Sequence, residues 1–472
     1  MGLIIFNTLS RSLEPFVPLD SASKKVGMYC CGPTVHNFAH IGNFRTFVCA
    51  DMVRRYLTFC GYEVKHVMNI TDVEDKIIAA VARSSQSLRD YTTAYQTAFL
   101  DDFQKLGCLK PDLLPRATDF IAEIINLIET LTKHGFAYRM ADGSVYFSID
   151  KYREAGRKYG QLLPLNFEEM KRGERVRADE YAKESVGDFA LWKGRVPEDG
   201  AVFWPSPWGE GRPGWHIECS AMSMKLLGTA FDLHLGGEDL IFPHHEDEIA
   251  QSEGACLHPA GEHFVRYWLH VAHLLVEGKK MAKSLGNFFT LRDLLGKGIA
   301  GREIRYLLIS SHYRESFNFT LEGLSAARSA LSRLDDYLQR LRGLAGQSRA
   351  EPNRKMLEEF TAGMDQDFNV SAAWGTLFAT IREQNRLMDE QKFGPAEAAS
   401  ALAAWERINS VFGLETKSQD RDIPGEISAL LEQRQAARKA RDFARGDQIR
   451  ETLKSNGWLI EDTPSGPRLK KT

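Results

Sequence analysis

The stretch KVGMYCCGPTVHNFAHIGN, residues 25–43, decides the fold. Residues 25–31 form an apolar run that is typical of a buried strand, and a Gly-Pro turn follows it. Residues 41–62 carry apolar side chains near helical spacing, and residues 63–71 resemble a second strand. A strand, a helix and a strand in this order predict a βαβ unit. They therefore predict a Rossmann-like parallel sheet, with ligands at the carboxyl ends of its strands.

The rest of the chain predicts an inserted region and two further domains. Residues 108–210 are punctuated by glycine, proline and charge, which indicates an α+β insertion into the first domain. Strand-like runs return at residues 230–237 and 267–278, and helical patterns dominate from residue 326. We therefore expect an α/β domain over residues 1–312, an α-helical bundle over 313–415, a polar linker, and a small basic domain over 425–472.

Composition places the chain among ordinary globular proteins. Of its 472 residues 43% are hydrophobic and 26% are charged, and the net charge is −3. No apolar run approaches membrane-spanning length, and the apolar run in MGLIIFNTLSR is too short for a signal peptide, so we expect a cytoplasmic protein that binds no membrane. Seven cysteines, an odd number spread over a long chain, argue against a disulfide framework. These thiols are then buried filler, metal ligands or catalysts.

The C-terminal segment is basic on an otherwise acidic chain. Residues 431–472 contain ten lysines and arginines against six aspartates and glutamates. This excess favours contact with a polyanion such as RNA. A solvated helix face is an equally good interpretation of the charge alone.

A metal site can be assembled from separate parts of the sequence. In PHHEDEIAQSE, residues 243–253, His244 and Glu248 are four apart and share a helix face. Cys219 lies upstream in PGWHIECSAM, and Cys31 ends the first strand; its strand parity and the following glycine favour it slightly over Cys30. Two thiolates, an imidazole and a carboxylate suit a tetrahedral Zn²⁺. An exposed polar helix start remains the alternative.

Two stretches could bind phosphate. HIGN, residues 40–43, opens the first helix, where free N–H groups and the helix dipole attract anions. The loop EGKKMAKSLGNF, residues 277–288, offers lysines that could neutralise a triphosphate. A satisfied helix cap and a solvated loop are the alternatives. GKGIAG, residues 296–301, matches G-x-G-x-x-G but follows a helix-like run, which argues against a dinucleotide site.

Taken together, these stretches closely resemble the cysteinyl-tRNA synthetase family of class I aminoacyl-tRNA synthetases. The matching segments run in order from near residue 5 to the C-terminus: IFNTLSR, GMYCCGPTVHNFAHIGN, RTFV, NITDVEDKII, PRAT, WPSPWGEGRPGWHIECSAM, FDLHLGGEDLIFPHHEDEIAQSE, KKMAKSLGNFFT and IEDTPSG. The resemblance implies a catalytic first domain, a helical tRNA-binding domain and an anticodon-recognition domain.

The resemblance also implies the site residues. One zinc ion per chain would be held by Cys31, Cys219, His244 and Glu248. Cysteine would be enclosed by Gly32, Thr71, Trp215 and His234. ATP, with Mg²⁺, would be bound by His36, Gly42, Gly237, Asp239 and Lys283. The two class I signatures would supply the catalytic residues His40, Asn43, Lys280 and Lys283.

The implied reaction has two steps and selects its amino acid by metal chemistry. L-cysteine and ATP would give cysteinyl-adenylate, and the cysteinyl group would then pass to the 3′ end of tRNA(Cys). The substrate thiolate would complete the zinc coordination, which rejects serine because its hydroxyl is a harder and far less acidic ligand. The family suggests a monomer. Asp462 is a candidate anticodon contact, and Arg438 and Arg441 are candidate phosphate contacts by charge.

Two other functions fit parts of the sequence. One is a paralogous ligase that joins cysteine to an amino-sugar, against which the basic C-terminal segment argues. The other is a non-catalytic RNA-binding zinc protein. Three departures from the family pattern bear on these alternatives: Asn43 replaces a histidine, Ala282 replaces a serine, and Leu235 replaces a glycine.

Overall fold

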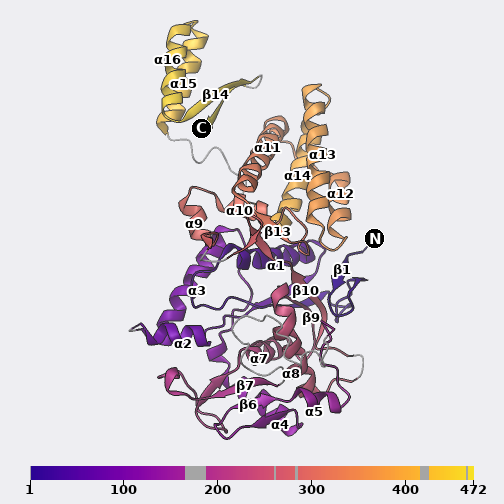
Figure 1. The fold of residues 1–472 in the computed structure, drawn as a ribbon. Coiled ribbons are helices and arrows are strands. Elements are labelled where there is room, and N and C mark those ends of the chain that lie inside the picture. The colour runs from indigo at the N-terminus through magenta and orange to yellow at the C-terminus, as the bar shows by residue number, and fades with distance from the viewer. Residues whose placement is uncertain are drawn as a thin grey trace.

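The central sheet is built from four parallel strands, β3 (Lys25–Cys30), β4 (Glu63–Met68), β9 (Phe231–Gly237) and β10 (Val265–Val271). They lie in the order β10-β9-β3-β4 in this computed structural model, of which β9 and β10 are labelled in Figure 1. The structure describes residues 2–84, 86–164, 188–259, 262–281, 285–414, 425–463 and 466–471, with side chains described up to residue 460.

Helix α1 (Ile41–Phe59) connects β3 to β4, so the predicted βαβ unit is confirmed. The helix is buried on most of its surface because it lies between the sheet and the helices that follow later in the chain (Figure 1). Its aromatic residues Phe44 and Phe47 both pack on Phe99 of α3 (Leu88–Lys105). This burial holds the start of α1 in place at the carboxyl ends of the strands, where a site is expected.

The N-terminal residues form a hairpin against β10. Strands β1 (Ile4–Asn7) and β2 (Ser12–Pro15) pair antiparallel. The backbone N–H of Thr8 donates to Trp268 O at 3.0 Å, and the Asn7 amide donates to Arg266 O at 3.0 Å. The hairpin therefore places residues from the start of the chain beside the last strand of the central sheet.

The region between β4 and β9 contains a second sheet, as the predicted insertion requires. Strands β5 (Ala137–Arg139), β6 (Val145–Phe147), β7 (Phe189–Gly194) and β8 (Gly211–Pro213) pair antiparallel in chain order. They have their own apolar core, shared with α4 (Ile121–Lys133) and α7 (Trp215–Leu227). Shorter elements of this region are α2 (Asp75–Ala82), η1 (Ala117–Asp119), α5 (Ile149–Glu154) and η2 (Pro197–Asp199).

Three helical elements follow β9 and lead into the last part of the first domain. These are η3 (Glu238–Leu240), the irregular turn η4 (Ile241–His245) and α8 (Glu246–Cys256). A small sheet of β11 (Leu274–Val276), β12 (Lys279–Lys280) and β13 (Phe317–Phe319) comes next, with α9 (Leu291–Gly296) and α10 (Gly301–Leu308). GKGIAG connects α9 to α10, so it follows a helix, as the sequence indicates, and not the strand that a dinucleotide-binding turn requires.

The helical bundle consists of α11 (Leu321–Ala345), α12 (Arg354–Met364), α13 (Val370–Asp389) and α14 (Pro395–Phe412). A stacked pair, Trp374 and Phe412, joins α13 to α14 with ring centroids 4.0 Å apart. Two arginines that pair with Asp51 of α1 join the bundle to the first domain: Arg305 of α10 donates to Phe412 O and Arg55 of α1 donates to Ser410 O, both near the end of α14. The domain boundaries predicted from sequence stay predictions.

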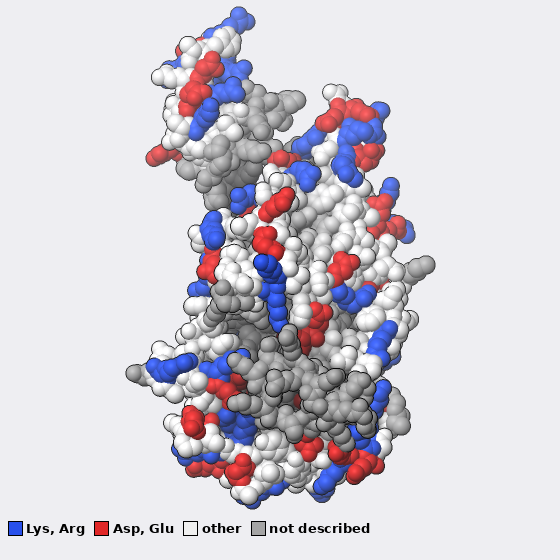
Figure 2. All heavy atoms as spheres, viewed as in Figure 1, with Lys and Arg blue, Asp and Glu red and all other residues white. Residues whose placement is uncertain are grey.

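The C-terminal unit comprises α15 (Gly425–Lys439), α16 (Phe443–Ser455) and the antiparallel pair β14 (Trp458–Thr463) and β15 (Gly466–Lys471). It is drawn in yellow in Figure 1. On the face of this unit that Figure 2 shows, basic side chains (Lys and Arg) and acidic side chains (Asp and Glu) are both present. Among the residues that the structure describes, no helix is long and apolar enough to cross a membrane.

Candidate metal and nucleotide site

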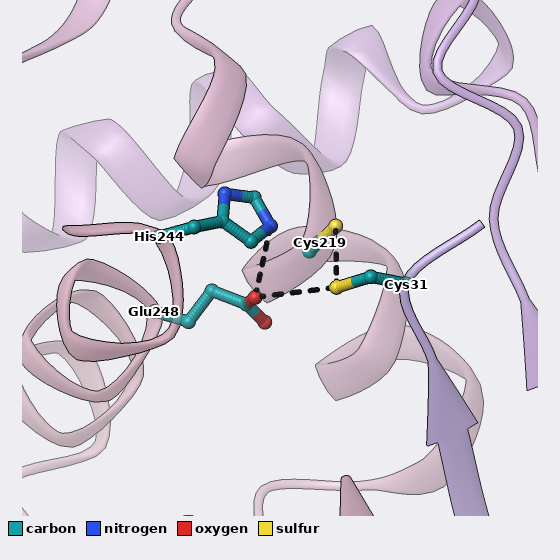
Figure 3. Close-up of side chains that lie close together, drawn as sticks. All are labelled: Cys31, Cys219, His244 and Glu248. Atoms are coloured by element: carbon teal, nitrogen blue, oxygen red, sulfur yellow. Dashed lines mark hydrogen bonds and ion pairs between the residues drawn. The ribbon is translucent and has the colours of Figure 1, made fainter. Parts of the chain in front are cut away.

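Cys31, Cys219, His244 and Glu248 lie together although 217 positions separate the first from the last (Figure 3). The two sulfur atoms are 4.0 Å apart, and Cys31 Sγ is 3.8 Å from Glu248 Oε1. His244 Nε2 lies 3.1 Å from the same carboxylate oxygen. One ligand atom from each of the four side chains falls within 4.8 Å of the others, and all four residues are buried. The sequence-predicted set is therefore brought together.

Each of these side chains comes from a different local structure. Cys31 directly follows β3, and its side chain packs with Cys219 in a cluster separate from the main core. Cys30, one residue earlier, belongs to that main apolar core together with Met28 and Met68. Since successive residues of a strand point to opposite faces, only one of the two thiols can reach Cys219, and it is Cys31. Cys219 lies on α7.

His244 and Glu248 share one helix face, as their spacing predicts. His244 belongs to η4 and Glu248 to α8, and their contact spans this junction. Pro243 lies in η4, at the start of the predicted helix.

The charged form is favoured in Cys219, His244 and Glu248, whereas burial, together with Cys219 and Glu248, raises the pKa of Cys31 well above its ordinary value. A hydrogen bond with Cys31 lowers the pKa of Cys219 to about 6, although burial opposes this. Burial also opposes the charges of Glu248 and His244. His234 and His244 nevertheless lower the pKa of Glu248 to about 2, and Glu248 with Cys219 raises the pKa of His244 to about 10. Thiolate, carboxylate and imidazole donors held together in this way suit a divalent cation of borderline softness such as Zn²⁺.

A second group of potential ligands overlaps the first. Cys31, His234, His245 and Glu248 also present ligand atoms within 4.8 Å of one another. His245 Nε2 is 3.4 Å from Cys31 Sγ, and His234 Nε2 is 3.0 Å from Glu248 Oε2. Sequence reasoning did not single out His245, although it lies in the same PHHEDE motif as His244.

The residues predicted to enclose the amino acid lie around this cluster. The ring of Trp215 stacks on that of His244 with centroids 4.3 Å apart. His234 is fully buried, where it contacts Glu248 and stacks on Trp268. Thr71 is buried and its hydroxyl donates to Glu218. Their predicted roles toward cysteine stay predictions.

Gly32 has a packing requirement of its own. Its backbone N–H donates to Asn69 Oδ1 at 2.8 Å, which joins the end of β3 to the end of β4. A Cβ on Gly32 would lie 1.7 Å from Asn69 O, closer than two atoms can approach. Only glycine fits at position 32, because the backbone of Asn69 approaches it too closely for any side chain.

The start of α1 meets the segment that contains the second signature. The backbone N–H of Ile41 donates to Phe289 O at 3.0 Å, and His40 forms a bridge with Thr290. A Cβ on Gly42 would lie 2.7 Å from Met281 Cε. The two class I signature segments, which are far apart in sequence, therefore touch. This is the arrangement that a shared phosphate site needs.

His40 is the N-cap of α1 and forms a capping box with Asn43. Burial lowers the pKa of His40 to about 4, an effect that His36 reinforces and Asp239 opposes. The imidazole is therefore neutral at pH 7, and any contact with phosphate would be a hydrogen bond.

The other residues predicted to bind ATP or to act on it differ in their position and exposure. Gly237 ends β9, where a Cβ would lie 2.4 Å from Asp239 Oδ1. Asp239 is exposed on η3, and Lys280 is exposed on β12. Lys283, Ala282 and Ser284 lie outside the described residues, as does the side chain of Asp462.

Family models match three parts of the chain. Residues 17–329 match the catalytic domain of tRNA synthetases class I (C), and residues 359–416 match the DALR domain. Residues 420–466 match the cysteinyl-tRNA ligase anticodon binding domain.

Curated relatives match from end to end. A protein of Chlamydia felis (strain Fe/C-56) named cysteine–tRNA ligase is 46% identical over 477 residues, covering 100% of this chain and 98% of the relative. A protein of the same name from Brachyspira hyodysenteriae (strain ATCC 49526 / WA1) is 45% identical over 483 residues, covering 99% of both chains.

Solved structures share the fold at low sequence identity. A Mycobacterium tuberculosis methionyl-tRNA synthetase in complex with methionyl-adenylate matches with a TM-score of 0.58 at 14% identity, covering 82% of this chain and 90% of that one. A putative arginyl-tRNA synthetase from Campylobacter jejuni matches with a TM-score of 0.56 at 13% identity, covering 83% and 93%. The predicted fold class is confirmed.

Proposed function

Because the chain belongs to the cysteinyl-tRNA ligase family of class I tRNA synthetases, we propose that it activates L-cysteine with ATP and transfers the cysteinyl group to tRNA(Cys). The resemblance that the sequence predicts is thereby confirmed, and with it an enzyme of the ligase class. Our finer proposals concern the metal, the roles of individual residues and the form of the substrates.

We propose that one zinc ion is held by Cys31, Cys219, His244 and Glu248. The observation that carries this is the convergence of four buried donors, from the residue after β3 and from α7, η4 and α8, on a region less than 5 Å across. Such a mixed set of sulfur, nitrogen and oxygen donors suits Zn²⁺ better than Mg²⁺ or Ca²⁺. Bound there, the ion would act as a Lewis acid that binds a thiolate more strongly than a hydroxyl.

Selection of cysteine over serine follows from that preference. The two amino acids have nearly the same shape, so a pocket that measures size alone discriminates poorly between them. Trp215, stacked on His244, would form one wall beside the metal. Thr71, His234 and Gly32 would form the rest of the amino-acid pocket. A metal–sulfur interaction that serine cannot reproduce removes the need for an editing site.

ATP would bind where the two signature segments meet. The first turn of α1 offers backbone N–H groups and the positive end of a helix dipole to the phosphates. His36, His40, Gly42 and Asn43 lie at or before that turn, and Lys280 and Lys283 would approach from the facing loop. Gly237 and Asp239 would bind the adenosine, and Mg²⁺ would accompany the phosphates.

Activation then needs no covalent enzyme intermediate. The cysteine carboxylate attacks the α-phosphate and pyrophosphate leaves. The tRNA 3′ hydroxyl later attacks the adenylate carbonyl, the bond from the carbonyl carbon to the phosphate oxygen breaks, and AMP and a proton are released. The chain would accelerate both steps by holding the reactants in line and by placing donors and lysines where negative charge grows.

The tRNA would be bound by the bundle and the C-terminal unit. The match of residues 420–466 to an anticodon binding domain supports this. Arg438, at the end of α15, and Arg441, just after it, are candidate phosphate contacts, and Asp462 is a candidate anticodon contact. A monomer in the cytoplasm stays our expectation.

ATP–pyrophosphate exchange with cysteine and with serine, followed by charging of tRNA(Cys), tests the function. We expect exchange with cysteine but not serine, and charging of the tRNA. Exchange without charging would favour a ligase with a small acceptor, such as an amino-sugar. No exchange would favour a non-catalytic RNA-binding zinc protein. Equal use of serine would refute selection by zinc.

A further inference from the structure

Two overlapping sets of ligand atoms share Cys31 and Glu248, and they differ in which imidazoles they use. The first set adds Cys219 and His244, whereas the second adds His234 and His245. An imidazole can bind a metal only through a nitrogen that carries no proton. Its other nitrogen must then carry the proton and needs an acceptor. The hydrogen bonds behind each histidine therefore decide which set is suitable.

His244 has a relay behind it that leads to a carboxylate. Its Nδ1 lies 2.9 Å from Nδ1 of His216. Nε2 of His216 lies 3.4 Å from Oδ2 of Asp247, an ion-pair contact, and that oxygen is buried and has no hydrogen-bond partner among the described residues. Oδ1 of Asp247 accepts from the hydroxyl of Tyr159 at 2.5 Å. His216, Asp247 and Tyr159 are all at least nine-tenths buried.

The direction of this relay follows from its two ends. When His244 Nε2 is the metal-binding atom, His244 Nδ1–H must donate, so His216 Nδ1 accepts. His216 then carries its proton on Nε2, and Asp247 Oδ2 is the acceptor that faces it. The proton on His244 Nδ1 then has an acceptor, the proton on His216 Nε2 faces an otherwise unpartnered carboxylate oxygen, and Tyr159 holds that carboxylate.

The imidazoles of the second set lack such support. Nδ1 of His234 is buried and forms no hydrogen bond with a described residue, so a proton there would be unsatisfied. His234 therefore carries its proton on Nε2, which donates to Glu248 Oε2. Behind His245, Nδ1 faces His270 Nε2 at 2.8 Å, and His270 Nδ1 faces the Thr8 hydroxyl at 2.7 Å. A hydroxyl can donate or accept, so this chain ends without a carboxylate and does not fix which nitrogen of His245 carries the proton.

We propose that His216 and Asp247 are positioning residues for the metal. Through their relay they hold His244 in the tautomer that binds the ion, and they thereby assign the ion to the set with two thiolates. This inference rests on the proposed zinc site. It adds two residues that touch neither metal nor substrate, and a reason why the ion would take His244 in preference to His234.

The test compares metal binding by the full-length chain and its variants, without using activity. Zn²⁺ affinity is measured by competition with a chromophoric chelator. Co²⁺ is then substituted, and the thiolate-to-cobalt charge-transfer absorbance is recorded per ion. His216→Leu removes the acceptor for His244 Nδ1–H, whereas His216→Asn places an amide oxygen near the position of His216 Nδ1.

We expect His216→Leu to weaken Zn²⁺ binding by about 10- to 100-fold, the usual cost of losing an outer-shell partner. His216→Asn should restore most of the affinity. Tyr159→Phe, at the outer end of the relay, should cause a smaller loss. Occupation of the second set in His216→Leu would lower the charge-transfer absorbance, because that set contains a single thiolate.

A matched control is His263→Leu. His263 also pairs with a carboxylate of α8, Glu253, at 3.4 Å, but it lies outside the cluster, so metal affinity should not change. Wild-type affinity and absorbance in His216→Leu, or equal losses in His216→Leu and His216→Asn, would overturn the relay. If His216→Leu fails to fold, the Zn²⁺ affinities of His216→Asn and Tyr159→Phe decide. A wild-type chain that binds no Zn²⁺ would instead refute the zinc site itself.

Discussion

The side chains of His40 and Asn43 cap helix α1 reciprocally. His40 Nδ1 accepts from the backbone N–H of Asn43 at 3.2 Å, and Asn43 Oδ1 accepts from the backbone N–H of His40 at 3.2 Å. The oxygen of Asn43 is therefore used by the cap, and its amide nitrogen is the part available to a phosphate. This residue stands where the class I pattern has a histidine, so the chain retains the helix end but lacks a side chain there that can carry charge.

We predict that Asn43→His speeds activation of cysteine. An exposed imidazole can protonate and offer a charge-assisted hydrogen bond, worth roughly 1–2 kcal/mol more than the neutral amide. ATP–pyrophosphate exchange should rise by about 5- to 30-fold at saturating cysteine. The ratio to the wild type should be larger at pH 6 than at pH 8, because an exposed imidazole loses its charge over that interval.

Asn37→His is the control for this effect. It adds an imidazole to the exposed loop that precedes α1, but outside the helix end. Its exchange rate should equal that of the wild type. An Asn43→His variant that exchanges no faster than the wild type would show that the missing charge costs this enzyme nothing.

Cys31→Ala and Cys30→Ala form a matched pair for the metal site. The two thiols are adjacent in sequence, yet Cys31 Sγ contacts Cys219 Sγ whereas Cys30 lies in the main apolar core. We expect Cys31→Ala to lower Zn²⁺ affinity by more than about 100-fold, since it removes a ligand outright. Cys30→Ala should retain bound zinc and lose only some stability. Zinc content after gel filtration measures both, and equal zinc loss in the two variants would contradict the assignment.

The part of the fold that followed from sequence is the part with strong local periodicity. The βαβ unit from β3 to β4 and helices α11, α13 and α14 have clear apolar patterns. Helix α12 was missed, although Met356, Phe360 and Met364 recur at helical spacing and are buried. The strands of the inserted sheet were not resolved individually, because runs such as β5 and β8 of three residues are too short to show an alternation.

The sequence allowed the four ligand residues of the metal site to be named, but their spacing alone could not show that they lie together. Local spacing placed His244 beside Glu248, whereas only the fold brings Cys31 to Cys219 across 188 positions. The family resemblance supplied what spacing alone could not. His216, His245 and His270 were missed because a single histidine in an apolar run carries no signal about its partners. A satisfied helix cap was the alternative interpretation of HIGN and is present, but the part of Asn43 in it was not predicted, because histidine is not a usual N-cap residue.

Stability should fall with acid because His66 is buried as a neutral ring. Burial, reinforced by Arg54, lowers the pKa of His66 to about 4, and its ring nitrogens form no hydrogen bond with a described residue. The unfolded chain has the ordinary pKa of about 6.5, so it binds more protons than the folded chain between pH 6.5 and 4. The stability held above pH 6.5 is lost as the pH falls through this window, by up to about 3 kcal/mol from this group.

His66→Leu should therefore reduce the acid sensitivity. Urea unfolding at pH 7.5 and pH 4.5 gives the change in free energy for each variant. The loss between these pH values should be smaller for His66→Leu than for the wild type. His273→Leu, which removes a half-exposed ring, should leave the loss unchanged. An identical acid loss in all three proteins would rule His66 out as the cause.

Asp51 should be a large single contributor to the junction between α1, α10 and the helical bundle. Its Oδ2 accepts from Arg305 at 2.5 Å and from Arg55 at 2.8 Å, and its Oδ1 accepts from the backbone N–H of Leu109 at 2.8 Å. Arg305 also donates to Phe412 O at the end of α14. Both charges of the central pair are 1% exposed, so removing the carboxylate leaves a buried guanidinium without its counter-charge.

We expect Asp51→Asn to lower the free energy of unfolding by about 3–5 kcal/mol, measured with urea at pH 7.5. The double variant Asp51→Asn/Arg305→Met should recover much of this, because it removes the unpaired charge as well. Glu383→Gln, which breaks an exposed pair with Arg386, should cause no measurable change. A loss below about 1 kcal/mol in Asp51→Asn would mean that water reaches Arg305 and that the junction does not depend on this pair.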